Sequence, residues 1–317
     1  MVEMRKHSRR GFTGLLLALL FRSGRVDSRA TASTPICLPQ RNASESTVGS
    51  TLRAKSRRYR ADAVILLLGI AFYRRAGVGG GQASIEETGE GASMRRIFFF
   101  AGGSDPKRAH GLRRLGWIRE VVRGSGATPT EADYFGVLTS SPEESLEHAR
   151  RSIANPPPGQ SVYSAVNGRH SVGHSRSAVT HFEFNSDATW SDHGLIAAAE
   201  STFHPKVEWH ETSWPDSANQ APATFLFQLA TLLEQRDRHA IGRYVYNEQE
   251  YLLEIEASQQ GGNERLRVVR GGVRNQRTRR QTAFRLWLED SSDSIVPVRI
   301  EFQPRSFLRL TFEALPA

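Results

Sequence analysis

Apolar and polar residues alternate along the last third of the chain. The apolar side chains Phe284, Leu286 and Leu288 are separated by single residues, and the segments 296–302 and 308–312 repeat this pattern. Successive side chains of a β-strand point to opposite faces, so a period of two places the apolar ones on one face of a sheet. Short polar loops separate the runs, as is typical of antiparallel strands. The pattern predicts a mainly β protein (β-rich α+β) with a curved antiparallel sheet or half-barrel.

Strand-like segments also fill the chain from Tyr59 onward. Apolar runs at 59–72, 96–101 and 117–122 are bounded by segments rich in glycine, aspartate or proline. The glycine-rich segment 77–81 predicts a flexible turn between strands, because glycine adopts backbone conformations that other residues avoid. The strand segments do not repeat as a sequence, so neither a solenoid nor a propeller is expected.

Two or three short helices are expected among the strands. The segment 223–235 carries five large apolar side chains at helical spacing, which predicts an amphipathic helix. Ser141 and Pro142 resemble a helix start, a capping residue followed by a first-turn proline, and predict a helix that ends near Ile153. A third, shorter helix is predicted at 106–115.

The N-terminus has the layout of an export signal. A basic stretch containing Arg9 and Arg10 precedes the short apolar run 15–21, and small residues at 30–32 provide a cleavage site. The twin arginines also resemble the signal of the route that exports folded proteins. The alternatives are a basic tail and an upstream start codon that is not the native one. Residues 1–32 are therefore predicted to be an export signal that directs the protein to the periplasm or cell envelope.

Domain boundaries follow from composition. Residues 33–56 are rich in Ser, Thr, Arg and Pro without periodicity, and they predict a disordered leader. Residues 57–317 are then a single β-rich domain. The apolar run 64–72 is far shorter than the roughly 20 residues of a membrane-spanning helix. No transmembrane span is expected.

The chain is basic, with a net charge of +9 and 42 Lys and Arg against 33 Asp and Glu. Residues 1–32 contribute a net +5, from seven basic and two acidic residues, so their removal would leave +4. One segment is dense in arginine and could bind an anionic surface. Nucleic acid is not the expected partner, because no aromatic residue is interleaved from 265 to 282. A charged hairpin that resists edge-to-edge pairing is the alternative. The residues concerned are Arg265, Arg267, Arg270, Arg274, Arg277, Arg279 and Arg280.

No linear motif identifies catalysis, a metal or a cofactor. The glycines at 77–81 lack the Gly-Lys-Ser/Thr of a phosphate loop, and the segment 173–177 lacks the last glycine of a nucleophile elbow. His210-Glu211 lacks the second histidine of a zinc-binding helix. The single cysteine, Cys37, excludes an intrachain disulfide. No catalytic, metal or cofactor residue is predicted.

An enzyme stays open as an alternative. It would be a hydrolase whose histidines and acids meet only in the folded chain, with His181, His204 or His210 beside an Asp or Glu in one pocket.

The C-terminal third resembles a known family. A helix at 223–235 precedes a strand that ends in Trp287-Leu288-Glu289-Asp290, and a turn then leads into Pro297-Val298-Arg299-Ile300-Glu301. This element resembles the exported bacterial proteins of the domain of unknown function family 3108. The resemblance implies a curved antiparallel sheet, similar to lipocalin-like and lipoprotein-carrier folds, in the cell envelope. It implies no catalytic residues.

The expected function is that of a non-enzymatic envelope protein whose curved sheet presents an apolar concave face. That face would bind a lipid or another hydrophobic ligand, or a partner protein of the envelope. The alternative is that the same side chains are core packed under the helix at 223–235. The candidate ligand-binding residues are Phe284, Leu286, Leu288, Val298, Ile300, Leu308, Leu310 and Phe312.

Overall fold

The computed structural model describes most of the chain from residue 51 onward. The described ranges are 51–67, 70–105, 107–109, 114–125, 128–139, 161–184, 188–204, 207–214, 219–259, 266–289, 295–305 and 308–316. No helix in these ranges is long and apolar enough to cross a membrane.

The described residues form one antiparallel sheet of 14 strands with two short α-helices, which confirms the predicted fold class. The strands are β1 (Thr51–Leu67), β2 (Ile70–Thr88), β3 (Arg95–Ser104), β4 (Leu115–Ser125), β5 (Thr128–Thr139), β6 (Ser161–Ser171), β7 (His174–Phe184), β8 (His210–Ser213), β9 (His239–Tyr246), β10 (Gln249–Gln259), β11 (Leu266–Asn275), β12 (Gln281–Glu289), β13 (Arg299–Arg305) and β14 (Leu308–Ala314). The helices are α2 (His193–Ser201) and α3 (Phe225–Gln235), and a 3₁₀ turn, η2, covers Gly91–Ser93.

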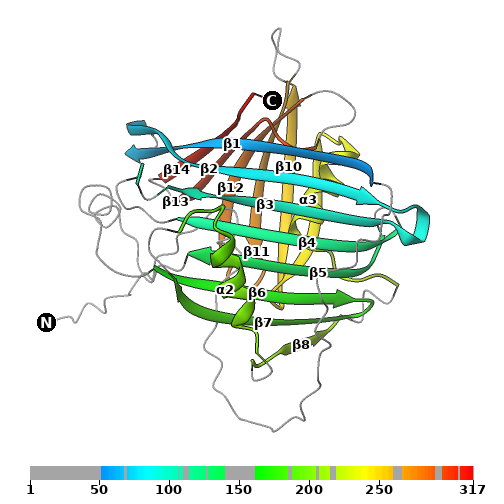
Figure 1. Cartoon of the computed structure of the whole chain (residues 1–317). Coiled ribbons are helices and arrows are strands. Elements are labelled where there is room, and N and C mark those ends of the chain that lie inside the picture. Colours follow the sequence, from blue (N-terminus) through cyan, green and yellow to red (C-terminus); the bar gives the residue numbers. More distant parts are fainter. Residues whose placement is uncertain are drawn as a thin grey trace, which may run out of the picture.

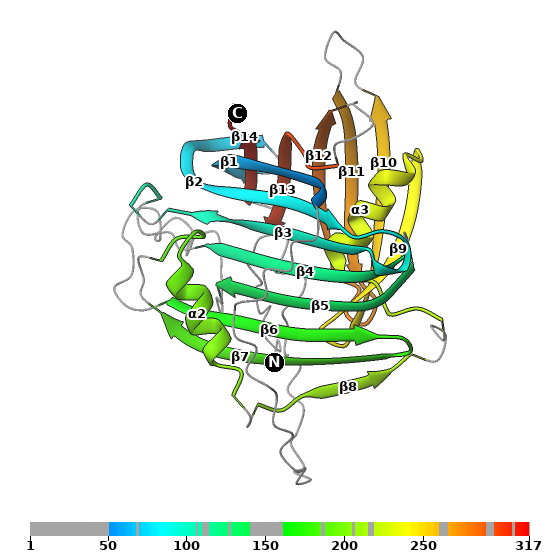
Figure 2. The ribbon, with the colours of Figure 1, turned by 45° about the vertical axis from the view of Figure 1, so that its right-hand side comes forward.

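The sheet consists of two meanders joined in the middle. The first meander contains β1 to β8 and the second contains β9 to β14, and β1 pairs with β14 to connect them. The strands of the second meander run across those of the first, behind them in Figures 1 and 2. The inner faces of both meanders thus enclose a common core, and the sheet ends at the edge strands β8 and β9.

A β-bulge at Asp62 marks the bend between the meanders. Ala61 pairs with Gly79 but Ala63 pairs with Arg75, so three residues of β2 face Asp62 alone. The buried Asp62 carboxylate accepts hydrogen bonds from the Gly77 N–H (2.7 Å) and from Arg74 (2.9 Å). Gly77 has a φ of 64°, in the left-handed region that glycine favours. Bulges of this kind bend strands and let them turn a corner between packed sheets.

The glycines at 77–81 do not form the predicted turn between strands. Except for the bulge they lie inside β2, and their lack of a side chain makes room for aromatic rings. On the inner face Phe312 packs against Gly81 and Gly102, where an added Cβ at Gly102 would lie 2.8 Å from the ring. On the outer face Trp190 lies over Gly80. Period and glycine content alone do not reveal such a close approach.

Two further predictions about β1 to β4 are corrected. The run 59–72 is not one strand, because β1 and β2 form a hairpin in which Leu67 pairs with Ile70. The predicted helix at 106–115 is not found among the residues of that segment that the structure describes, 107–109 and 114–115. Asp105 caps only a turn at 107–109, and β4 begins at Leu115 because it pairs with β3.

The predicted helix at 223–235 is confirmed as α3, whereas α2 was not predicted. The predicted helix at 142–153 and the export signal at 1–32 lie outside the described residues. β1 begins at Thr51, inside the segment 33–56 that was predicted to be a disordered leader. Its first residues extend the pairing with β2.

Candidate functional site

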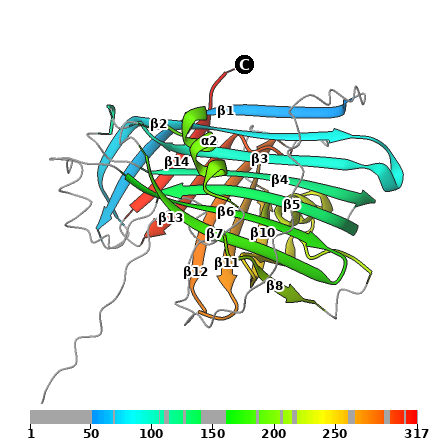
Figure 3. The ribbon, with the colours of Figure 1, turned by 60° about the horizontal axis from the view of Figure 1, so that its bottom comes forward.

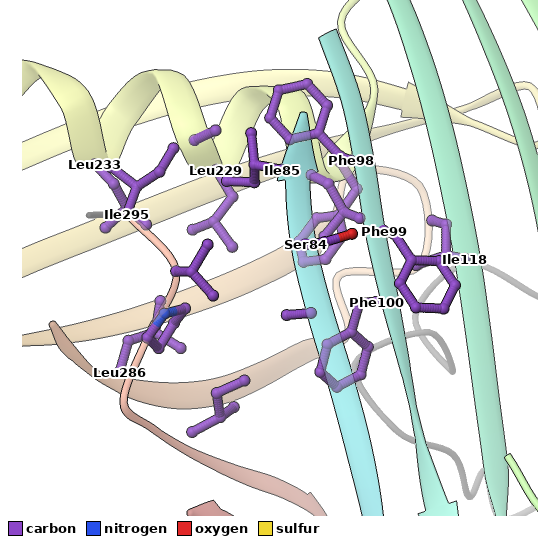
Figure 4. Close-up of a pocket in the computed structure, with 17 residues that line it drawn as sticks. Ser84, Ile85, Phe98, Phe99, Phe100, Ile118, Leu229, Leu233, Leu286 and Ile295 are labelled. Atoms are coloured by element: carbon purple, nitrogen blue, oxygen red, sulfur yellow. The ribbon is translucent and has the colours of Figure 1, made fainter. Parts of the chain in front are cut away.

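An apolar cavity of about 80 Å³ lies between the two meanders, under α3. Figure 4 shows it bounded by α3, by β2, β3 and β4 of the first meander, and by the second meander opposite. Its walls are hydrocarbon with almost no polar surface. The lining residues are Ala83, Ser84, Ile85, Phe98, Phe99, Phe100, Ile118, Phe225, Leu226, Leu229, Ala230, Leu233, Leu286, Ile295, Val296, Pro297 and Ile300.

Helix α3 covers the cavity because its apolar residues contact both meanders. Phe227 packs edge-on against Phe98 of β3, with ring centroids 6.1 Å apart. Phe225 packs against Tyr244 of β9 at 5.3 Å. The helix therefore lies wedged between two sheet faces, with Leu226 and Leu229 toward the cavity.

The N-terminus of α3 is capped by a side chain from another strand. Thr224 occupies the capping position but makes no capping hydrogen bond to the helix. The buried Glu120 of β4 accepts hydrogen bonds from the Thr224 hydroxyl (2.6 Å) and from the N–H groups of Leu226 and Phe227 (both 3.0 Å). These N–H groups have no partner within the helix, and a carboxylate suits the positive end of the helix dipole.

Burial raises the pKa of Glu120 to about 7, although the hydrogen bonds from Leu226, Thr224 and Phe227 oppose that rise. These partners all donate, so they favour the ionised carboxylate, while the surrounding apolar core disfavours it. The charge state of Glu120 is thus set by a balance that lies close to neutral pH.

The C-terminus of α3 is also held by the sheet. Arg267 of β11 donates a hydrogen bond to the Leu233 carbonyl oxygen (2.9 Å), one of the carbonyl groups that a helix end leaves without an intrahelical partner. Arg236 then ends the helix in a left-handed conformation, with a φ of 57°. Arg267, a member of the arginine-rich segment, is thus partly buried and holds the end of α3.

The predicted ligand-binding residues lie mostly in the packed core. Only Leu286 and Ile300 line the cavity. Val298 is half-buried, and its backbone N–H bonds to the Trp287 carbonyl. The others are buried among the core side chains: Phe284, Leu288, Leu308, Leu310 and Phe312.

Most of the cavity wall was not among the residues predicted from the sequence. Three of its members, Phe98, Phe100 and Ile118, come from the first meander, and their own alternation was the available signal. Alternation indicates which face a residue occupies. It does not indicate which distant strand lies opposite.

The remaining arginines of the predicted anionic surface are divided between strand and turn. Arg270 and Arg274 are exposed on β11, and Arg277, Arg279 and Arg280 are exposed in the turn before β12. Asn275 shapes that turn by accepting from the N–H groups at 277 and 278. Arg265 lies outside the described residues. The described arginines therefore lie on a β11–β12 hairpin in which β11 is paired on both sides, by β10 and β12. Binding of an anionic surface by these residues stays a prediction.

The three histidines of the hydrolase alternative are not brought together with acids. His181 bonds to Ser164 (2.9 Å), and His204 and His210 are exposed. In the described ranges none of the three makes a hydrogen bond or ion pair with an Asp or Glu. The same ranges hold no group of three or more His, Cys, Asp or Glu side chains that could bind a metal ion.

A different serine, histidine and acid do meet, at the tips of two hairpins. Ser175 pairs across β6 and β7 with His170 and donates to Glu248 (2.7 Å), and Trp214 donates to Ser175. Burial lowers the pKa of His170 to about 4, so its ring is neutral and donates from Nε2 to the Val245 carbonyl (3.1 Å). Ser175 and His170 have no exposed surface, so this cluster fastens the β6–β7 hairpin to β9–β10 and is closed to a substrate.

No protein-family model matches the chain, and the comparisons with curated proteins and with solved structures found no match. The resemblance to family 3108 therefore stays a prediction.

Proposed function

We propose that this protein is a non-enzymatic binding protein that takes an apolar group, such as an alkyl chain, into the cavity under α3. The supporting observation is the cavity itself. Protein interiors are closely packed and contain few voids larger than a water molecule. The cavity of about 80 Å³ leaves apolar wall without packing partners, and an apolar occupant would supply them.

The chemistry and size of the cavity restrict the occupant. Water is disfavoured, because a buried water needs two to four polar partners and the walls are almost entirely hydrocarbon. Sites for drug-sized ligands occupy roughly 300–1,000 Å³. The cavity as it stands accepts only a slim apolar group. A longer chain requires α3 to move away from β3 and β4, pivoting on its packing against β9.

The test is binding of cis-parinaric acid, a fatty acid that becomes fluorescent in an apolar site. Ala230→Leu places a larger side chain into the cavity from α3. We expect the wild-type protein to bind the probe and Ala230→Leu to bind about tenfold more weakly or not at all. Its thermal stability should be retained, because the added methyl groups fill a void.

Ala197→Leu is the matched control, because Ala197 is exposed on α2. It should bind like the wild type. The proposal is wrong if the wild-type protein leaves the probe dark, or if a folded Ala230→Leu variant binds as tightly as the wild type.

We further propose that the protein acts in the cell envelope after export. This proposal is supported by the twin arginines and the apolar run 15–21. Replacing Arg9 and Arg10 by lysine should retain the protein in the cytoplasmic fraction of the producing cell. Unchanged fractionation would argue against the twin-arginine route.

A further inference from the structure

A row of aromatic side chains follows the outer face of the first meander. Phe99 of β3 packs edge-on against Trp117 of β4 (5.5 Å between centroids), and Trp117 against Phe135 of β5 (5.7 Å). Phe203, just after α2, continues the row at 5.9 Å from Phe135. The solvated face of an antiparallel sheet is normally polar. A half-exposed aromatic row there calls for a covering element or a ligand.

Helix α2 covers only one end of this row. It lies on the outside of the first meander, as Figure 3 shows, and packs with Phe135 and Phe203 around the buried Leu195 and Ala199. Beyond the start of α2 the rings of Phe99 and Trp117 form the floor of a groove of about 440 Å³. That volume lies within the range of small-molecule sites, roughly 300–1,000 Å³.

The walls of the groove are held in place by specific contacts. Trp190 forms one wall and rests on Gly80, where an added Cβ would lie 3.3 Å from the indole nitrogen. Asp192 caps α2 by accepting from the N–H groups of Gly194 (2.9 Å) and Leu195 (3.4 Å), which fixes the chain next to Trp190. The turn that carries Trp190 is therefore held by its contact with β2 and by the cap on α2.

Polar side chains lie beside the aromatic rings in the groove. Arg58 of β1 pairs with Gln82 of β2, and the same row continues through Ala101 to Trp117 of β4, so these polar residues share the sheet face that carries Trp117. Among the described residues neither side chain makes a hydrogen bond or ion pair, so their donors and acceptors are available to a ligand. Ser191 and His193 add polar atoms at the rim, and Asp192 balances the charge of Arg58.

We propose that this outer groove binds a neutral sugar ring of a glycan. A pyranose has flat C–H faces that pack on aromatic rings and hydroxyl groups at its edge. The indoles of Trp117 and Trp190 offer the rings, and Arg58 and Gln82 offer planar, multidentate hydrogen-bonding groups. A hydrocarbon would leave those polar groups unsatisfied. An anion would gain little, because Arg58 and Asp192 oppose one another in the same groove.

The test is saturation-transfer NMR with chitotetraose, cellotetraose and maltotetraose on the full chain. At least one of these should receive saturation from the wild-type protein. Trp190→Ala removes a wall. Ser191→Trp blocks the groove from its exposed rim and removes only one exposed hydrogen bond, between the Ser191 and Thr189 hydroxyls (3.1 Å). Both should lower the affinity about tenfold or more. The second variant decides the matter if the first fails to fold.

Trp209→Ala is the matched control, since Trp209 is also half-buried but does not line the groove. It should bind like the wild type, as should Ala230→Leu, which alters only the inner cavity. The inference is wrong if no tetrasaccharide is saturated, if Ser191→Trp binds unchanged, or if adenosine is saturated in their place, which would indicate a nucleobase site.

Discussion

Glu120 links a strand of the first meander to the start of α3. Its carboxylate substitutes for the missing cap at Thr224, and it lies in an apolar core with no exposed surface. Two effects oppose one another at this carboxyl group. The helix N-terminus favours its ionised form, and desolvation disfavours that form. The position of the helix over the cavity thus depends on one ionisable residue.

The raised pKa of Glu120, about 7, predicts a pH dependence of stability. Between its ordinary value near 4.5 and 7 the folded protein binds a proton that the unfolded chain has lost, so stability falls as pH rises through this window. The full loss is about 3 kcal/mol. Glu120→Gln should remove this slope. Urea unfolding between roughly pH 5 and pH 8 measures it.

Glu256→Gln is the control for this series, because Glu256 is exposed on β10. Its pH profile should follow that of the wild type. Parallel profiles for Glu120→Gln and the wild type would show that the helix donors keep the carboxyl ionised throughout.

Glu248 shows how a strained residue is stabilised by a distant partner. Asn247 and Glu248 occupy the β9–β10 turn with φ values of 48° and 54°, which glutamate rarely adopts. The hydrogen bond from Ser175 to the Glu248 carboxylate offsets this strain. The β9–β10 turn is therefore stabilised by its contact with the β6–β7 hairpin. A turn with glycine in place of Glu248 would not need that contact.

At the scale of elements, the β1–β2 ribbon bends the sheet. Asp62 stabilises the bulge in the β1–β2 hairpin. In this hairpin β2 pairs with β3 of the first meander and β1 pairs with β14 of the second. Burial by itself raises the pKa of Asp62. The hydrogen bonds from Gly77 and Arg74 and the positive charges of Arg60 and Arg74 outweigh burial, so the pKa is lowered.

Asp62→Asn should destabilise the protein at neutral pH by about 1–3 kcal/mol, the usual loss when a buried charged hydrogen bond is broken. Because the folded pKa is lowered, the carboxylate stabilises the fold above the unfolded pKa, near 4, and this contribution is lost as pH falls further. The difference from the wild type should therefore shrink in acid. Urea unfolding at neutral and acidic pH is the measurement.

Asp237→Asn, at an exposed position, should be neutral at both pH values. A constant difference between Asp62→Asn and the wild type would assign the effect to shape at the bulge and not to charge.

Helix α2 illustrates an element that was present in the sequence but not recognised. Asp192 is a standard capping residue and the alanines at 197–199 favour a helix. The segment is only nine residues long, and most of its stability comes from packing against the sheet. The sequence does not predict this packing, because the outer aromatic row forms only in the folded protein.

At the scale of the whole molecule, the first and last strands pair in the middle of the sheet. The pairing of β1 with β14 joins the meanders, and the Tyr59 hydroxyl donates to the Pro297 carbonyl (2.7 Å) across the same junction. Each meander leaves one side of its core for the other to cover. Neither is expected to be stable alone.

The two meanders should therefore unfold as one unit. Trp287 reports on the second meander, and the other four tryptophans lie at positions 117, 190, 209 and 214. With 5-fluorotryptophan incorporated, all five fluorine resonances should lose intensity at the same urea concentration. An earlier loss of the Trp287 resonance would show that the second meander unfolds separately.

The sequence by itself determined the mainly β fold class, the alternating strands of the last third and the amphipathic helix α3, because these follow from neighbours within a few residues of one another. It indicated that Leu286 and Ile300 face inward. Only the tertiary structure decided what they face. The cap between Glu120 and Thr224 spans 104 residues, and the bond from Tyr59 to Pro297 spans 238. Local periodicity carries no information about such contacts, which arise when the bend at Asp62 brings two distant inner faces together around one core.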